Sequence, residues 1–103
     1  MPGGSNVFAT NDACPLCGAD AERIDDPVRD AQHFRNCPNC KEYRMTNTFL
    51  ASIRAWRTGV SDPRMSEGLL KKLSTAARQA IEHGDEMVCI TEENAGAVAS
   101  WTG

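Results

Sequence analysis

The sequence has few aromatic residues, only two histidines and no long apolar run. Phe, Trp and Tyr together make up 6% of the 103 residues. No stretch approaches the roughly 20 consecutive apolar residues that a membrane-spanning helix requires, so we expect no membrane contact. The N-terminal Met-Pro-Gly-Gly-Ser-Asn lacks the basic and apolar regions of a secretory signal. These absences predict a cytoplasmic protein with one folded domain.

The common motifs of catalysis are also absent. The chain has no Gly-rich phosphate loop, no Gly-x-Ser-x-Gly and no His-Glu-x-x-His. The zinc deaminase signature requires His-x-Glu and then Pro-Cys-x-x-Cys, whereas His33 is followed by Phe-Arg-Asn and then Cys37. Neither His33 nor His83 has an acidic or nucleophilic partner at a motif spacing. We therefore predict a protein that is not an enzyme and has no small-molecule substrate.

Five cysteines are present, and four of them form two Cys-x-x-Cys pairs. The odd number and the expected reducing compartment argue against a disulfide framework. Nineteen residues separate the two pairs, a spacing typical of zinc sites. Four thiolates complete the tetrahedral coordination of zinc and leave no position for a substrate. The spacing therefore predicts one structural Zn²⁺, held by Cys14, Cys17, Cys37 and Cys40.

Two other chemistries suit paired cysteines. Four thiolates also bind iron in rubredoxin-like sites, which makes iron the main competing metal. A thioredoxin-type redox pair requires a Cys-x-x-Cys that opens a helix after a strand, and neither pair has that setting. The fifth cysteine, Cys89, lies in the apolar run Met87–Ile90. A lone cysteine there usually acts as a small buried hydrophobe, and a reactive role is the alternative.

The sequence around the cysteines favours short strands. Residues 21–25, 32–36 and 42–46 have strand character and are separated by polar or cysteine-containing turns. We expect three short antiparallel strands that form a zinc ribbon. Phe34, Tyr43 and Met45 would pack its small core, and the alternative is that they cover the metal site.

Helical patterns dominate the second half of the chain. Asn47 is the expected N-cap of a helix over 48–58 that ends before Gly59. A second periodic stretch runs from about Ser66 to His83, as one helix or as two broken at Ser74. A last helix is expected to begin at Thr91-Glu-Glu-Asn and to reach toward Trp101.

The predicted fold class is therefore small α+β, with a three-stranded zinc ribbon followed by two to four short helices. We expect residues 1–11 to be a flexible N-terminus and residues 12–103 to form a single domain. Within that domain, residues 12–46 would be the ribbon and residues 47–103 the helical part.

The second cysteine pair carries a resemblance to a known family. The run Cys-Pro-Asn-Cys-Lys-Glu-Tyr-Arg-Met-Thr over 37–46, followed by a helix, resembles the zinc-ribbon modules that open many bacterial multidomain proteins. The resemblance continues more weakly at 73–78, 82–84 and 90–94. It implies a metal-binding recognition module of bacterial or phage origin. Lys41 stands where the family commonly has glycine, and the chain ends where those proteins continue, so we carry over no effector activity.

Charge is distributed unevenly along the chain. Residues 1–34 carry a net charge of −4, residues 35–78 carry +6 and residues 79–103 carry −5. Two functions fit this pattern. The first is a zinc-binding module that docks on a protein partner as an adaptor, regulator or inhibitor, with Trp101 as one anchor. The alternative is nucleic-acid binding through the basic segment 35–78. The predicted contact residues on that segment are Arg35, Lys41, Arg44, Arg54 and Arg57.

Overall fold

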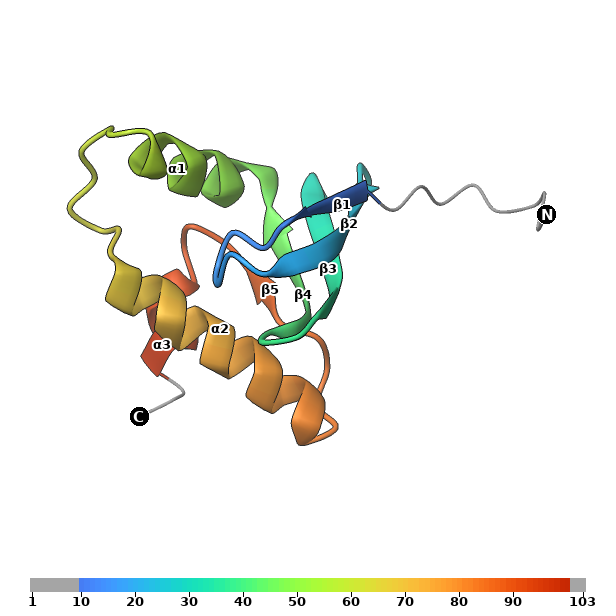
Figure 1. Ribbon diagram of the computed structural model, residues 1–103. Coiled ribbons are helices and arrows are strands. Elements are labelled where there is room, and N and C mark those ends of the chain that lie inside the picture. Colours follow the sequence, from blue (N-terminus) through green and yellow to red (C-terminus); the bar gives the residue numbers. More distant parts are fainter. Residues whose placement is uncertain (1–9, 101–103) are drawn as a thin grey trace.

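The computed structural model describes residues 10–100 of the protein, as five strands and three helices (Figure 1). The strands form one sheet in the order β1-β2-β3-β4-β5, antiparallel throughout except for the parallel pair β4 and β5. In chain order the elements are β1 (Thr10–Ala13), β2 (Asp20–Asp26), β3 (Ala31–Cys37), β4 (Lys41–Thr46), α1 (Asn47–Arg57), α2 (Glu67–Glu82), β5 (Cys89–Ile90) and α3 (Ala95–Ser100).

The prediction of three strands is wrong, because the sheet has two further strands at its edges. Strand β1 has the polar sequence Thr-Asn-Asp-Ala and no apolar alternation, so only its pairing with β2 makes it a strand. An ion pair of 3.0 Å between Asp12 and Arg23 joins these two strands. Strand β5 is two residues of the apolar run and lies parallel to β4, with Met45 opposite Ile90. Strand β1 begins at Thr10, inside the segment predicted to be flexible, and residues 1–9 of that segment lie outside the described residues.

The three central strands agree with the predicted pattern, and their turns use unusual backbone. Asp30 closes the turn between β2 and β3 with a φ of 50°. Asn36 (φ 56°) and Lys41 (φ 68°) flank the turn between β3 and β4. These angles lie in the left-handed region, which glycine adopts at no steric cost. Lys41 therefore occupies a backbone conformation that favours glycine.

The helices begin at side-chain caps. Thr46, and not the predicted Asn47, is the N-cap of α1, because its hydroxyl accepts a hydrogen bond from the Phe49 amide. Ser66 caps α2 in the same way. Helix α2 is one continuous helix, and Ser74 lies inside it as a buried residue. After Thr91-Glu-Glu-Asn, which forms a turn, α3 begins at Ala95.

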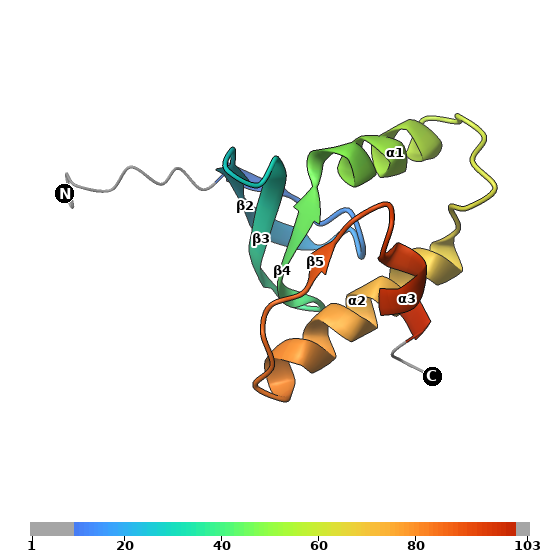
Figure 2. The same cartoon turned by 180° about the vertical axis from the view of Figure 1, so that it is seen from behind.

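The core lies between the sheet and the helices. Helices α1 and α2 both contact β4, and α3 packs against α2 (Figure 2). Phe34 and Tyr43 stack face to face across β3 and β4, with ring centroids 5.1 Å apart. Helix α2 adds Leu70 and Leu73, which are fully buried. Phe34, Tyr43 and Met45 are all fully buried, so the expectation that they pack the core is confirmed, and Tyr43 also contacts Cys14.

Candidate metal centre

The topology of the sheet brings the two cysteine pairs together. Consecutive turns of an antiparallel meander lie at opposite ends of the sheet, so the first and third turns share one end. The β1–β2 turn carries Cys14 and Cys17, and the β3–β4 turn carries Cys37 and Cys40. Pairs that are distant in sequence therefore face each other below one end of the sheet.

The four sulfurs are close enough to share one metal ion. All four Sγ atoms lie within 4.8 Å of one another. The Cys14–Cys40 distance is 3.6 Å and the Cys17–Cys37 distance is 3.3 Å. A zinc ion with Zn–S bonds of about 2.3 Å separates its sulfur ligands by about 3.8 Å in a tetrahedron. The donor set and its spacing thus fit a four-coordinate thiolate site, with both pairs contributing equally.

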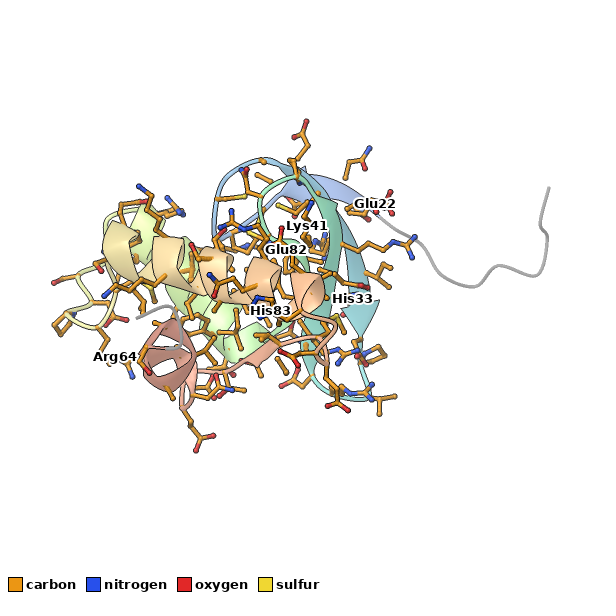
Figure 3. All side chains as sticks on the ribbon, turned by 90° about the horizontal axis from the view of Figure 1, so that it is seen from below. Glu22, His33, Lys41, Arg64, Glu82 and His83 are labelled. Carbon is orange, nitrogen blue, oxygen red and sulfur yellow. The ribbon has the colours of Figure 1, made fainter. Side chains whose placement is uncertain are left out.

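Three of the four clustered cysteines are buried. Cys14, Cys37 and Cys40 are at most 2% exposed, whereas Cys17 is partly exposed. Cys89 belongs to β5 and lies outside the cluster. Neither histidine reaches the sulfurs: His33 pairs with Glu42 across two strands at 2.6 Å, and His83 ends α2 (Figure 3). The cluster therefore contains sulfur ligands only.

Hydrogen bonds inside the cluster shift the pKa values of its cysteines in different directions. A hydrogen bond from Cys40 and a second from Tyr43 lower the pKa of Cys14 to about 5, despite burial. The same contact with Cys14, together with burial, raises the pKa of Cys40 above its ordinary value. Burial is also the main cause that raises the pKa of Cys37 and of Tyr43. Several thiolates in one buried space repel each other, and a divalent cation at their centre removes that repulsion.

Two hydroxyl groups contact the sulfurs: the Tyr43 contact fits the alternative that Tyr43 covers the metal site, whereas the sequence did not indicate the Ser74 contact. The Tyr43 hydroxyl lies 3.0 Å from Cys14 Sγ, and the Ser74 hydroxyl lies 2.9 Å from Cys40 Sγ. Ser74 comes from α2, 34 residues after Cys40. No spacing rule connects a serine of the helical part to the ribbon, so only the folded chain reveals this contact.

The predicted basic contact residues are largely paired within the chain. Each of the four arginines lies beside a carboxylate, whereas Lys41 has no ion pair within residues 10–100. The pairs are Arg35–Glu22 (2.8 Å), Arg44–Asp26 (3.0 Å), Arg54–Asp12 (3.5 Å) and Arg57–Glu67 (3.1 Å). Arg44 and Asp26 form an ion pair without a hydrogen bond, because the buried Nε of Arg44 has no hydrogen-bond partner. Trp101 lies outside the described residues.

These pairs join segments of opposite charge. Three of the four carboxylates come from the acidic segment 1–34, and their partners come from the basic segment 35–78. Hydrogen bonds from Arg35 and then Asn36 hold the pKa of Glu22 below its ordinary value. Folding therefore places acidic groups against most of the basic residues that a nucleic acid would need.

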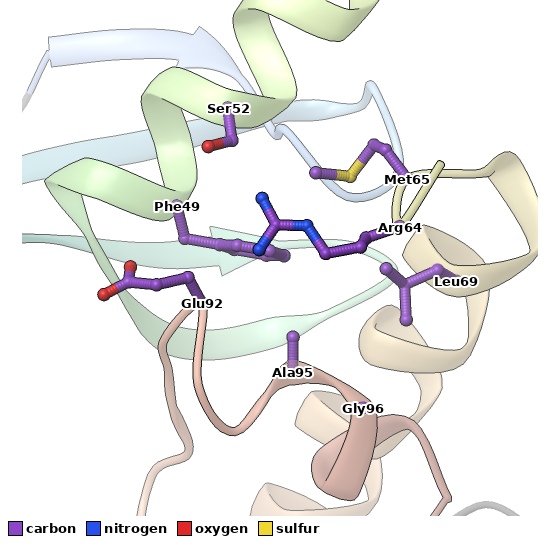
Figure 4. A pocket seen from close by; sticks show the side chains of 8 residues that line it. All are labelled: Phe49, Ser52, Arg64, Met65, Leu69, Glu92, Ala95 and Gly96. Atoms are coloured by element: carbon purple, nitrogen blue, oxygen red, sulfur yellow. The ribbon is translucent and has the colours of Figure 1, made fainter. Parts of the chain in front are cut away.

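A small apolar pocket lies on the helical side of the molecule (Figure 4). Its volume is about 220 Å³, and α1, α2, α3 and the segment before α2 form its walls. Arg64 extends across it toward Phe49, and Glu92 lies at its edge. The remaining lining residues are Ser52, Met65, Leu69, Ala95 and Gly96.

Comparisons with known proteins return no relatives. No protein-family model, no curated protein and no solved structure matches this chain. Among residues 10–100, none of the helices has both the length and the apolar character needed to cross a bilayer.

Proposed function

We propose that the protein is a non-enzymatic zinc-binding module that docks on a protein partner as an adaptor, regulator or inhibitor. The observation that carries the metal assignment is the cluster of four cysteine sulfurs within 4.8 Å of one another. Zinc is favoured because a closed set of four thiolates is its usual structural site. Iron in a rubredoxin-like site is the competing assignment.

The closed donor set supports a structural and not a catalytic role for the metal. Catalytic zinc sites keep one position open for water or substrate, whereas four thiolates fill a tetrahedron. Within residues 10–100, the histidines do not converge with a nucleophile: His33 bonds to Glu42, and His83 ends α2. Both observations favour a module that acts by binding.

The pocket between the helices supports a protein as the partner. A volume of about 220 Å³ falls below the roughly 300–1,000 Å³ of common small-molecule sites and suits one large apolar side chain. Its walls include the buried Phe49, Met65 and Ala95. Its charged groups are Arg64, which extends across the pocket, and Glu92, which lies at its edge. An apolar centre with a polar rim is the usual form of an interface anchor site.

Nucleic-acid binding remains the second candidate because the segment 35–78 carries a net charge of +6. The internal ion pairs count against it. Exposed pairs stabilise a fold by only about 0–1 kcal/mol, but a phosphate must compete with the carboxylate already beside each arginine. The acidic pI of 5.3 also weakens long-range attraction to a polyanion.

Metal content is the first test of this proposal. Native mass spectrometry of the purified protein is expected to show one zinc per chain, which a strong chelator removes. Iron at the same stoichiometry would replace zinc in the assignment. A chain with four free thiols and no affinity for either metal would refute the metal assignment.

The partner is tested with a variant that fills the pocket. Gly96 lines the pocket, and a Cβ placed there meets no atom within 4 Å, so Gly96→Leu is expected to add bulk at the pocket wall without a steric clash at its Cβ. Ala97→Leu is the matched control, because Ala97 is exposed on the same helix and does not line the pocket. We expect a protein captured from the host lysate to be lost with Gly96→Leu and kept with Ala97→Leu.

The alternative function has its own test. Fluorescence anisotropy with labelled DNA and RNA is expected to show no binding at low salt. Salt-dependent binding that disappears in Arg54→Glu plus Arg57→Glu would instead establish nucleic-acid recognition.

A further inference from the structure

Two hydroxyl groups contact the sulfur cluster from separate elements. Ser74 Oγ, from the middle of α2, lies 2.9 Å from Cys40 Sγ. Tyr43 OH, from β4, lies 3.0 Å from Cys14 Sγ. Both hydroxyl-bearing residues are buried, as are both cysteines. Tyr43 is fully buried and Ser74 is 8% exposed, so bulk water competes little with these hydrogen bonds to sulfur.

We propose that Ser74 and Tyr43 are positioning residues of the metal centre and donate hydrogen bonds to its thiolates. The inference rests on the proposed metal binding. A cysteine that binds zinc has lost its proton and can only accept a hydrogen bond. In the metal-bound protein both hydroxyls are therefore the donors. Sequence motifs for zinc assign neither residue.

The behaviour of other hydroxyls on the helices sets Ser74 apart. A serine or threonine inside a helix commonly bonds the carbonyl four residues earlier. Ser52 and Thr75 do so, with Thr48 and Lys71 as their acceptors. Within the described chain, the Ser74 hydroxyl instead reaches outward to the sulfur. The Ser74 hydroxyl thus bonds to the cysteine cluster and not to a carbonyl of its own helix.

The charge of the site gives the reason for such donors. One divalent cation with four thiolates carries a net charge of −2, and burying a charge without hydrogen bonds is costly. Cys37 Sγ accepts a bond from the Cys40 amide at 3.4 Å, and Cys17 is partly exposed. Cys14 and Cys40 are the two ligands that receive hydroxyl donors. Three of the four sulfurs therefore have a hydrogen-bond donor beside them, and the fourth belongs to the partly exposed Cys17.

The Ser74 contact also links the helical part to the ribbon. Helix α2 packs on β4 through apolar side chains such as Leu73, and apolar contacts are less directional than a hydrogen bond. A directional bond from Ser74 to a metal ligand selects one rotation. Leu69, five residues earlier on α2, lines the apolar pocket. The metal centre thereby contributes to the position of one pocket wall.

Cobalt substitution tests the inference directly. Co²⁺ bound to thiolates shows sulfur-to-metal charge-transfer absorption, whose energy reports electron density on the sulfurs. Removing a donor raises that density, so we expect Ser74→Ala and Tyr43→Phe each to move the band to lower energy. We also expect about tenfold or greater loss of zinc affinity in a chelator competition, the usual effect of removing such partners. Thr75→Ala, which removes a hydroxyl bound to its own helix, is the matched control and should change neither value.

The outcomes separate this inference from the proposed function. If the wild-type protein binds neither Co²⁺ nor Zn²⁺, the proposed metal binding itself fails. If the wild type binds one metal and Ser74→Ala keeps its band and its affinity, the role of Ser74 is overturned while the metal centre stands. The same reading of Tyr43→Phe decides the role of Tyr43, independently of whether Ser74→Ala folds.

Discussion

Replacing one cluster cysteine should cost the protein its metal and much of its stability, whereas replacing the fifth cysteine should cost little. We compare Cys37→Ser with Cys89→Ser, because both exchange sulfur for oxygen. Cys37 Sγ lies 3.3 Å from Cys17 Sγ inside the cluster and is 2% exposed, while Cys89 is partly exposed on β5 outside the cluster. The pair therefore separates ligand loss from the general cost of the exchange.

The size of the effect follows from linkage between metal binding and folding. A ligand present at about 1,000 times its dissociation constant stabilises the folded state by about 4 kcal/mol. For a domain of this size, each kcal/mol shifts the melting temperature by about 4–8 °C. Loss of the metal in Cys37→Ser should therefore lower the melting temperature by about 15 °C or more. A partly exposed exchange such as Cys89→Ser should cost about 1 kcal/mol or less.

The assay is thermal unfolding by circular dichroism, with metal content measured on the same samples. Wild type and Cys89→Ser should each hold one metal and lose stability when a chelator is added. Cys37→Ser should hold less than one metal and respond weakly to the chelator. Equal metal content and equal melting temperatures in the two variants would refute the assignment of the cluster as a structural metal centre.

Three further predictions follow from local features. Lys41→Gly should stabilise the protein by about 0.5–1 kcal/mol in denaturant unfolding, because φ is 68° at Lys41. Gly18→Lys should destabilise the protein, because φ is 79° at Gly18. A Lys41→Gly variant that is less stable than wild type, or a Gly18→Lys variant that is more stable, would contradict the role given to these backbone angles. Leu73→Ala should cost about 2–5 kcal/mol in the same assay, since Leu73 is fully buried; a cost below about 1 kcal/mol would mean that α2 does not pack on the sheet. Acidification should release zinc, because protons compete with the metal for the thiolates. The stability that the metal contributes is therefore present at neutral pH and is lost as the pH falls. Metal release measured across pH without a chelator checks this.

The four clustered cysteines could be predicted from sequence because a knuckle is a local structure. Two cysteines three positions apart are held by one turn, and the repeat of that spacing identifies the second turn. Helix ends were predictable for the same reason, since Ser66 and Gly59 act on residues within one turn of helix. The first N-cap is Thr46 and not the predicted Asn47: both side chains can cap a helix, and the end of strand β4 decides which one does.

Other features depend on contacts that no local pattern encodes. Strand β1 has a polar sequence and exists through its pairing with β2. The net charge of segment 35–78 suggested a basic surface, yet Arg54 lies beside Asp12, which is 42 residues away in sequence. Charge counted along the chain does not predict the charge presented by a folded surface, because folding pairs distant side chains.

The sequence by itself determined which four cysteines cluster, the three central strands, and the positions of α1 and α2 to within one residue at each end. The spacing of turn cysteines and the capping of helices involve residues close together in sequence, so both can be predicted from the sequence. Tertiary structure alone decided that Tyr43 and Ser74 meet Cys14 and Cys40, and that three helices enclose a pocket beside Arg64. Those contacts depend on how β4 and α2 pack, and packing selects partners by shape and burial and not by distance along the chain.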